Sequence, residues 1–514
     1  MTENLLETAS QARERDRYTI ETEHIPSLVL MENAARSLCR LLQTRLLPDS
    51  RVLILCGPGN NGQDGLAMLR ILREQGVDAC AFSQSDSSQQ QQILSARGIE
   101  PVTNPEQALR QMSALSRDDW IVDAMFGSGL SRPLTGLWEQ LAQAADSSRA
   151  RILSVDVPSG IHGTLGPLSA AVIHADLTGA LQTQKVGTIL PASLPCTGET
   201  RILDIGLGNP GTDRDTFLLT ETVACQALPG RSALSYKGTF GKALMIGGCK
   251  TMHGAMEMSA KACFHSGIGL LTVAVPPVLQ PPLRCVLPEA MLLDLHSDPD
   301  FLSEEAIPEI LKATAEMSVV SAGNGLSRTP SSRELVRSLM LNTECTLVLD
   351  ADALSLLDLT WLKARQGQTI LTPHPGEFSR MTGISPQELQ KDPVTAARAF
   401  SRQYPGTVLV LKGDITCVSC DGQTWVLARP DSALAKGGSG DVLCGIITGL
   451  AGSQNPLQAA LCGVWAHNQA AAISEKDPAA FSPQDLTGSL STVWTKLRNS
   501  PGNSPLPNDG KHTV

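Results

Sequence analysis

The sequence predicts an α/β protein with two domains, and three observations lead to this fold class. The chain has 514 residues, whereas one hydrophobic core stops growing at roughly 250–300 residues. Short runs rich in β-branched residues end in Gly, Pro or Asp and alternate with longer helical patterns, which is typical of βαβ units around a mainly parallel sheet. The 44 Gly and 32 Pro residues suit many turns between strands and helices.

Each predicted strand of the first half ends beside a polar motif, the position at which open α/β sheets bind ligands. These strands are Arg51–Cys56, Asp119–Ala124, Ile152–Val157 and Arg201–Ile205. The pattern stops at Gly206–Arg214, a stretch with Gly, Asp, Asn and Pro210, which we predict to be a linker. The first domain is therefore expected to span residues 1–210.

A second set of strands follows the linker, with helical patterns between most of them. They are Ala243–Gly247, Leu271–Val275, Ser318–Ala322, Thr346–Leu349, Thr369–Thr372, Thr407–Leu411 and Thr424–Leu427. We expect the second domain at residues 222–498. Residues 499–514 contain Pro, Asn, Gly and Ser and predict a disordered tail.

Composition excludes several function classes. The formal net charge is −10, from 41 Lys and Arg against 51 Asp and Glu, and there is no basic run. Nucleic acid and anionic membrane are therefore not expected as partners. No run of about 18 apolar residues predicts a membrane span, and residues 1–11 carry two Glu with no apolar core of a secretory peptide. We expect a cytoplasmic protein.

Cysteine usage agrees with a reducing compartment. The 13 Cys residues are scattered from Cys39 to Cys462 without the spacing of a disulfide framework, so they predict reduced core thiols. The one Cys-x-x-Cys pair, Cys417 and Cys420, lies in a strand-like run. We interpret it as structural and not as a zinc or redox motif.

The first strand runs into a glycine-rich loop, Gly57–Gly65, followed by a helix near Leu66. Such glycines let backbone amides approach a ligand, and the helix N-terminus favours negative charge. The loop is neither the Gly-x-Gly-x-x-Gly fingerprint nor a Walker A motif. Asp123 and Asp156 each lie beside a Gly/Ser turn at the end of a later strand. Each is either a site residue or a cap of the helix that follows.

The strongest signal of the second half is Lys436–Leu443, which reads Lys-Gly-Gly-Ser-Gly-Asp-Val-Leu and leads into an apolar helix. Glycines before a helix expose its unpaired amides to an anion, and Asp441 in the first turn can accept a proton from an attacking hydroxyl. This arrangement indicates phosphoryl transfer. Ser439 or Asp441 as a simple helix cap is the alternative.

Polar residues at other strand ends of the second half join this motif. His374 stands between two prolines, which fix the loop around it, and Lys412 precedes a glycine at the end of a strand. Asp350 and Asp352 follow another strand, and oxygen-ligand chemistry makes either of them a candidate to orient magnesium. Both residues could contact a ligand. The alternatives are that His374 is only structural and that Lys412 is a solvated surface residue.

Residues 8–208 resemble the NAD(P)H-hydrate epimerases. The resemblance rests on Arg13–Asp16, Ile25–Ala34, the glycine-rich loop, the two Asp turns and Lys185–Gly187, in the family's order. One departure is Gln63, where the family usually has a second Gly, and it could perturb the loop backbone. The resemblance implies a Rossmann-like three-layer αβα domain.

The epimerase resemblance also implies residue roles. Asp156 would be the acid/base group beside the nicotinamide ring, with Lys185 supporting it, because a positioned carboxylate can shuttle the proton that opens and recloses the hydrated ring. Asn61, Asp123 and Ser159 would bind a potassium ion through oxygen ligands. The residues expected to cradle the hydrated dinucleotide are Asn60, Asn61, Gly62, Gln63, Asp64, Gly127, Ser128, Gly129, Leu130, Ser131, Arg132, Pro133 and Asp156.

Residues 225–495 are similar to the ADP/ATP-dependent NAD(P)H-hydrate dehydratases, which have a ribokinase-like αβα fold. Supporting motifs are Lys237–Gly241, His253–Ala255, Ser266–Ala274 and Gly323–Leu326. By this resemblance Ala255, Gly325, His374 and Asp441 contact the hydrated nucleotide. ADP would be held by Lys412, Gly413, Asp414, Ile415, Thr416 and Gly440.

Together the two halves resemble the bifunctional NAD(P)H-hydrate repair enzymes. The implied function is epimerisation of the hydrated cofactors NADHX and NADPHX, followed by dehydration of the S epimer. ADP with magnesium would be consumed to give AMP and phosphate, with ATP as the other possible donor. In this mechanism Asp441 deprotonates the ring hydroxyl, which attacks the terminal phosphoryl group. A homo-oligomer is expected.

Two other hypotheses stay open at this point. The second half could be a true kinase of a small alcohol, which needs the same attack on phosphorus but accumulates a phosphorylated product. The first half could be a binding module without catalysis, with Gln63 as the mark of a lost active site. Potassium-dependent interconversion of the epimers would contradict the second hypothesis.

Overall fold

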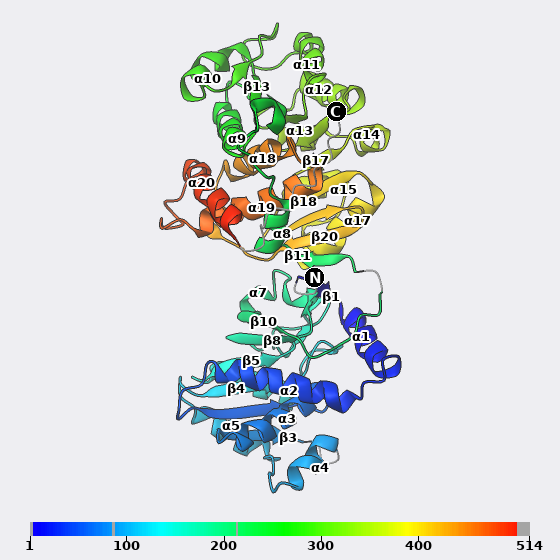
Figure 1. Cartoon of the computed structure of the whole chain (residues 1–514), viewed down its shortest axis with the longest axis vertical. Coiled ribbons are helices and arrows are strands. Elements are labelled where there is room, and N and C mark those ends of the chain that lie inside the picture. The colour runs from blue at the N-terminus through cyan, green and yellow to red at the C-terminus, as the bar shows by residue number, and fades with distance from the viewer. Residues whose placement is uncertain (1–3, 85–87, 212–213, 501–514) are drawn as a thin grey trace. The chain divides into compact units, whose positions relative to one another are not determined.

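The structure, a computed structural model, describes residues 4–84, 88–211 and 214–500 (Figure 1). The chain divides into two compact units, residues 1–216 and 217–514. Each unit has its own sheet between helices, so the prediction of a two-domain α/β protein is confirmed. Most of the predicted disordered tail, from residue 501 on, lies outside the described residues. Within the described residues no helix is both long and apolar enough to cross a membrane.

The N-terminal unit contains a parallel six-stranded sheet in the order β10-β8-β5-β4-β2-β3. This doubly wound order reverses between β2 and β4, the point at which such sheets place their ligands. The strand bounds are β2 (Arg51–Cys56), β3 (Asp78–Ser83), β4 (Trp120–Ala124), β5 (Arg151–Val155), β8 (Leu177–Leu181) and β10 (Glu199–Leu203).

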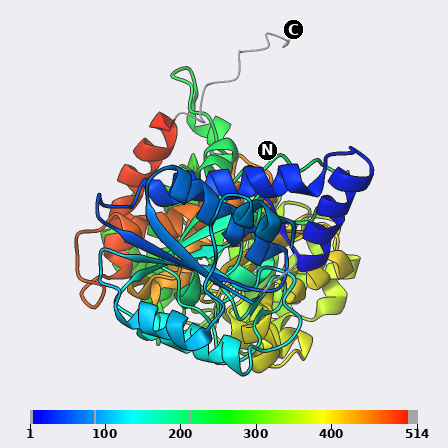
Figure 2. The ribbon, with the colours of Figure 1, turned by 90° about the horizontal axis from the view of Figure 1, so that it is seen from below.

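Alternate residues of β2 pack into two different cores, which makes this unit a three-layer structure. Val52 and Ile54 belong to a core that they share with the helices α2 and α3. Leu53 and Leu55 belong to a core that they share with α5 and α6. Figure 2 shows the sheet between these two pairs of helices. The bounds are α2 (Ser27–Gln43), α3 (Asn60–Glu74), α5 (Pro105–Ser113) and α6 (Leu137–Ser147).

Shorter elements complete the N-terminal unit, and four of them, β1, α1, α4 and β9, line its cavity. The helix α1 (Ala9–Glu21) begins with a capping box at Thr8. The two-residue strands β1 and β9 pair in parallel beside it. The remaining bounds are β1 (Leu6–Glu7), α4 (Gln89–Ser95), β6 (Ile161–His162), β7 (Gly166–Pro167), β9 (Gln184–Lys185) and α7 (Leu194–Thr197).

The C-terminal unit contains a ten-stranded sheet in the order β11-β20-β19-β18-β17-β16-β15-β12-β13-β14. The strands from β18 to β14 pair in parallel, whereas β18, β19 and β20 form an antiparallel meander. The bounds are β11 (Thr216–Leu218), β12 (Lys242–Ile246), β13 (Leu270–Ala274), β14 (Met291–Leu292), β15 (Val319–Ala322), β16 (Thr346–Leu349), β17 (Thr369–Leu371), β18 (Thr407–Leu411), β19 (Thr416–Cys420) and β20 (Gln423–Leu427).

The largest core of this unit joins the sheet to α9 (His253–His265), α18 (Ser439–Ala451), α19 (Pro456–Ala472) and α20 (Pro483–Asn499). The helix α17 (Pro393–Gln403) contacts β18, β19 and β20 with residues outside that core. The other helices are α8 (Glu221–Ala227), α10 (Gln280–Val286), α11 (Ile307–Thr314), α12 (Pro330–Asn342), α13 (Asp352–Leu356), α14 (Leu359–Ala364), α15 (Pro375–Thr382) and α16 (Pro386–Lys391).

Two candidate active sites

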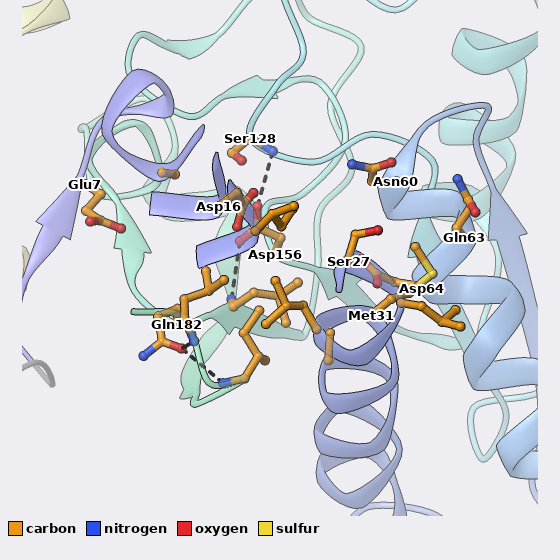
Figure 3. A pocket seen from close by; sticks show the side chains of 18 of the residues that line it. Glu7, Asp16, Ser27, Met31, Asn60, Gln63, Asp64, Ser128, Asp156 and Gln182 are labelled. Atoms are coloured by element: carbon orange, nitrogen blue, oxygen red, sulfur yellow. Dashed lines mark hydrogen bonds between the residues drawn. The ribbon is translucent and has the colours of Figure 1, made fainter. Parts of the chain in front are cut away.

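A cavity of about 490 Å³ opens in the N-terminal unit between α1, α2, the first turn of α3 and the turn after β5 (Figure 3). It lies at the carboxyl edge of the parallel sheet, where the strand order reverses. The titratable groups of its wall are Glu7, Asp16, Asp64, Asp156 and Lys185. Glu7 is paired with Arg15 and Arg214, and Asp156 with Lys185, whereas Asp16 and Asp64 have no ion-pair partner among the described residues.

Asp156 is held in an unusual backbone conformation at the end of β5. Its φ is 64°, a left-handed value that a residue other than Gly rarely adopts and that marks a constrained functional turn. Lys185 Nζ lies 2.6 Å from Asp156 Oδ1. The amide of Ser128 donates to Oδ2 and that of Leu181 to Oδ1, both at 3.3 Å. The carboxylate predicted to be the acid/base group is therefore fixed from three directions.

Lys185 uses every donor of its ammonium group. Besides Asp156, Nζ donates to the carbonyls of Leu181 at 2.8 Å and Thr183 at 2.9 Å. The residue is buried in β9, and β9 pairs with β1. A lysine with three fixed acceptors orients a carboxylate well and has no free donor for another partner. Its predicted supporting role fits this geometry.

Of the three residues predicted to bind potassium, Asp123 and Ser159 are in contact beneath the loop after β4, and Asn61 lies beside Gly127 of that loop. Ser159 Oγ lies 2.6 Å from Asp123 Oδ1 and 3.1 Å from the carbonyl oxygen of Phe126. A hydroxyl has one proton and cannot donate to both oxygens. Asn61 is adjacent, because a Cβ on Gly127 would lie 3.0 Å from Asn61 Oδ1. Its Nδ2 is buried and has no partner among the described residues.

This cluster of oxygens suits a monovalent cation. Burial raises the pKa of Asp123, although hydrogen bonds from Ser159 and Ser154 act in the opposite direction. A bound cation would compensate both the buried carboxylate and the excess of oxygen acceptors, and oxygen-only donors are what a hard cation prefers. The residues present therefore fit the predicted potassium ion.

The structure brings only part of the predicted dinucleotide cradle into the cavity wall. Asn60, Gln63, Asp64 and Ser128 line the cavity with Asp156. Gly62 lies behind the wall, and a Cβ there would come within 1.9 Å of the Gly57 carbonyl oxygen. The others lie elsewhere: Leu130 is buried in a hydrophobic core, and Gly129, Ser131, Arg132 and Pro133 are exposed outside the cavity wall.

Gln63 does not distort the loop. It lies in the first turn of α3, where its amide donates to the Gly59 carbonyl in ordinary helical fashion. Its φ is not positive, so this position does not require glycine. The concern that Gln63 perturbs the backbone is therefore wrong, and its side chain lines the cavity instead.

Three residues on or beside α1, Glu7, Arg15 and Asp16, have no role predicted from the sequence. Arg15 donates two hydrogen bonds to the buried Glu7 and one to the Gly208 carbonyl. Glu7 also accepts from Thr183 Oγ1 at 2.6 Å. These bonds fix α1 over the cavity, so that the next residue, Asp16, lines it. The Arg13–Asp16 motif was visible in the sequence, but no local pattern showed which side chain points at the ligand.

A second cavity, of about 630 Å³, opens in the C-terminal unit. Its wall comes from the ends of β17, β18 and β20, the N-terminus of α18 and the facing side of α19. Of the residues predicted to hold ADP, Lys412, Gly413, Asp414, Thr416 and Gly440 line it, whereas Ile415 is buried behind them. His374 also lines this cavity and caps α15 by accepting the Gly376 amide at Nδ1.

Asp441 stands in the first turn of α18 and belongs to a chain of polar contacts. Asn324 Nδ2 donates to Asp441 Oδ1 at 2.7 Å and to Asp350 Oδ2 at 3.2 Å. Burial raises the pKa of Asp441 to about 6, the Asn324 hydrogen bond opposes that shift, and the charge of Asp350 adds to it. A carboxyl group with such a pKa suits a general base near neutral pH.

Lys412 connects this chain to the cavity. Its Nζ lies 3.0 Å from Asp350 Oδ1, and a Cβ on Gly440 would come within 3.3 Å of it. Burial lowers the pKa of Lys412, but the charges of Asp350 and Glu377 outweigh burial and raise it. Lys412 therefore stays an ammonium group beside the unpaired amides of α18, which is a favourable place for phosphate.

Three other residues predicted for this site, Ala255, Gly325 and Asp352, lie outside the cavity wall. Ala255 and Gly325 are neighbours, since a Cβ on Gly325 would lie 3.3 Å from Ala255 Cβ, but neither lines the cavity. Gly325 has φ 66°, so it requires glycine. Asp352 is engaged by Arg328 Nε and the Ser327 amide, both at 2.9 Å.

His467 lines the second cavity and was not predicted from the sequence. Its Nε2 lies 3.1 Å from Ser439 Oγ and 3.0 Å from the Ser439 carbonyl oxygen, at the start of α18. Burial lowers the pKa of His467 to about 4. The ring is therefore neutral at pH 7 and supports the loop that precedes the helix.

Among the described residues no group of three or more His, Cys, Asp or Glu side chains could hold a metal ion. Magnesium is commonly bound by one or two carboxylates together with substrate phosphates and water. Asp350 is the carboxylate that the structure places in contact with both Lys412 and Asn324. The residues present fit a magnesium ion that arrives with a nucleotide.

Comparisons with known proteins agree with this division into two sites. Residues 243–491 match the family described as NAD(P)H-hydrate dehydratase, and residues 27–187 match the YjeF-related protein N-terminus. The bifunctional NAD(P)H-hydrate repair enzyme Nnr of Moorella thermoacetica is 33% identical, over 96% of this chain and 97% of that protein. The Nnr of Thermosynechococcus vestitus is 34% identical, over 91% and 93%.

Among solved structures, the ADP/ATP-dependent NAD(P)H-hydrate dehydratase from Bacillus subtilis, co-crystallised with ATP and Mg²⁺, is 33% identical. It covers 55% of this chain and 98% of its own, with a TM-score of 0.47.

Proposed function

Because this chain belongs to the bifunctional NAD(P)H-hydrate repair enzymes, we propose that its two cavities divide the repair of hydrated nicotinamide cofactors between them. The protein is an NAD(P)H-hydrate epimerase and dehydratase. The cavity that Asp156 lines would interconvert the R and S epimers of NADHX and NADPHX. The cavity beside Asp441 would dehydrate the S epimer with ADP or ATP as the phosphoryl donor.

In the epimerase site the chain's own residues hold and move a proton. Asp156, oriented by Lys185, would accept the proton of the ring hydroxyl and return it after the ring recloses. Potassium at Asn61, Asp123 and Ser159 would supply positive charge near the bound dinucleotide. Asn60, Gln63 and Ser128 would contact that dinucleotide from the cavity wall.

In the dehydratase site Asp441 would take the proton from the ring hydroxyl, whose oxygen then attacks the terminal phosphoryl group of ADP. Loss of phosphate from C6 together with a proton from C5, which passes to solvent, restores the C5=C6 double bond, so the products are NAD(P)H, AMP and phosphate. The amides at Gly438–Gly440 and the Lys412 ammonium would stabilise charge on the transferred group. Magnesium neutralises nucleotide phosphates when bound, and Asp350 is the better-placed carboxylate to orient it because Asp352 pairs with Arg328.

The observation that carries this proposal is the position of Asp441, a half-buried carboxyl group with a pKa of about 6 at a glycine-preceded helix N-terminus. The test follows NADH absorbance after the purified chain is mixed with both NADHX epimers, ADP and magnesium. Asp441→Asn is expected to stop NADH recovery while the epimers still interconvert. Asp156→Ala is expected to leave one epimer unconsumed.

The exposed Glu316→Gln variant serves as a control, because Glu316 pairs with Lys242 on the surface, away from both cavities. If Asp441→Asn restores NADH as fast as the unmodified chain, the assignment of Asp441 is wrong. Accumulation of a phosphorylated product that does not break down would favour the small-alcohol kinase.

A further inference from the structure

Three carboxyl groups from three different elements open on the epimerase cavity. Asp16 comes from α1, Asp64 from α3 and Asp156 from the turn after β5. Within the part of the chain that the structure describes, only Asp156 has an ion-pair partner, Lys185. Asp64 is 8% exposed, so a carboxyl group without a counter-ion is nine-tenths buried at this wall. A purely structural wall has no reason to place these groups together.

The position of Asp16 is fixed by the residue before it. Arg15 lies fully buried and binds Glu7 and the Gly208 carbonyl, while the Ala9 amide donates to Thr164 Oγ1 at 2.8 Å. These bonds hold α1 against the rest of the unit at two positions, Ala9 and Arg15. Asp16 therefore lines the cavity in a fixed place, and Figure 3 shows it beside Asp156.

The surroundings of Asp16 and Asp64 raise the pKa of both carboxyl groups. Burial, and then the charge of Asp156, raise the pKa of Asp16 to about 6. Burial raises the pKa of Asp64 well above its ordinary range, and the charges of Asp156 and Asp16 add to this. Asp16 therefore exchanges its proton near physiological pH, and the buried Asp64 binds a proton more readily than an exposed carboxylate does. A carboxyl group whose pKa lies near the working pH can serve as a general acid.

We propose that Asp16 is a second catalytic residue of the epimerase, the acid that works opposite the base Asp156. The inference rests on the proposed function of this cavity. As the ring opens, Asp156 takes the hydroxyl proton, the C6–O bond becomes a carbonyl and the C6–N1 bond breaks. The electron pair of that bond stays on N1, which takes the proton of Asp16. Reclosure on the other face reverses each transfer, so protons and electrons balance without another reactant.

Asp64 has a different part in this arrangement. Its side chain is buried at the wall without an ion-pair partner among the described residues, and in its protonated form its hydroxyl would donate a hydrogen bond to the substrate. Asp16 differs from Asp64 in that its side chain is accessible from the cavity, where Figure 3 shows it beside Asp156. General acids are most effective when their pKa is near the working pH.

The test compares Asp16→Asn with the unmodified chain in the interconversion of separated NADHX epimers, in potassium buffer without ADP. We expect kcat to fall at least 100-fold, as for loss of a general acid, while KM changes less than about threefold. The unmodified enzyme should lose kcat as the pH rises above about 6, because Asp16 loses its proton, and the variant should lack that decline. Asp16→Glu should restore part of kcat.

Glu21→Gln is the matched control, since Glu21 is exposed at the end of the same helix. Calorimetry that compares the unfolding transitions of Asp16→Asn and the unmodified chain shows whether the N-terminal unit, which carries the substitution, is folded. A variant that keeps kcat and the alkaline decline, or that changes KM alone, overturns the role of Asp16 and leaves the epimerase intact. If the unmodified chain itself does not interconvert the epimers, the proposed function of this cavity fails and the role of Asp16 fails with it.

Discussion

Asn324, in the loop after β15, donates a hydrogen bond from Nδ2 to Oδ1 of Asp441, in the first turn of α18, at 2.7 Å. Burial raises the pKa of Asp441 to about 6, and this hydrogen bond limits the rise because it stabilises the ionised carboxylate. Asn324 itself is 1% exposed and contacts Asp350 with the same amide nitrogen. The proposed base and the carboxylate beside Lys412 are thus coupled through one side chain.

Asn324→Ala is expected to move the acid limb of the dehydratase pH profile upward by about 1–2 pH units. A hydrogen bond to a charged group is worth about 1.5–3 kcal/mol, and one pKa unit corresponds to about 1.4 kcal/mol. Asp441 must be ionised to accept a proton, so the variant should lose more rate at pH 6 than at pH 8. NADH recovery from pH 5.5 to 8.5 measures this. An unmoved limb, or an equal shift in the exposed Asn342→Ala control, would contradict the prediction.

Lys185→Met is expected to destabilise the N-terminal unit by about 3–5 kcal/mol, the usual cost of removing one partner of a buried ion pair. The substitution leaves Asp156, 7% exposed, without its counter-ion and also strands the carbonyls of Leu181 and Thr183. Calorimetry of the first unfolding transition measures the change. The double variant Lys185→Met/Asp156→Asn should regain part of the lost stability, and additive losses would show that the pair is not energetically coupled.

Replacing potassium by choline at constant ionic strength is expected to slow epimerisation at least tenfold. The oxygens of Asn61, Asp123 and Ser159 would then lose the cation that offsets the buried carboxylate. Ser159→Ala should raise the potassium concentration needed for half-maximal rate, whereas the exposed Ser113→Ala should not. Potassium titrations of the epimerisation rate give both values. If the epimerisation rate of the unmodified chain is independent of potassium, the prediction that these residues bind potassium is wrong.

The sequence predicted buried parallel strands well and edge strands poorly. The bounds of β2 and β18 agree with the predicted Arg51–Cys56 and Thr407–Leu411 residue for residue, because strands buried on both faces are continuous apolar runs that stop at polar turns. The edge strand β10 begins two residues earlier than predicted, since its exposed side chains give no clear apolar pattern. The strand β8 was not predicted, because Gly179 and Ala180 within it weaken the pattern of β-branched and apolar residues.

The candidate sites show a similar division. Asp156 and Asp441 were found because each directly follows a strand or a glycine-rich loop, and a local motif can report that position. No local motif identifies Asp16, because it lies on a helix that precedes the sheet. That helix is held over the cavity by the hydrogen bond from Arg15 to the Gly208 carbonyl, 193 residues away in the chain. His467 is hidden inside the largely apolar α19. The roles of all these residues stay predictions.

His467→Gln is expected to make the C-terminal unit less sensitive to acid. The pKa of His467 falls from an ordinary 6.5 in the unfolded chain to about 4 in the folded one, so the unfolded chain binds more protons between these values. Stability that is complete above pH 6.5 is therefore lost as the pH falls toward 4, by up to about 3 kcal/mol at 1.36 kcal/mol per unit.

A glutamine in this place can still donate a hydrogen bond to the Ser439 carbonyl and does not titrate. Unfolding of both proteins at pH 7.5 and pH 5 measures the difference. The variant should be equally or less stable at pH 7.5, because it fills the ring's space less well, yet lose less stability on acidification. Equal losses on acidification in both proteins would mean that His467 is not the group that takes up the proton.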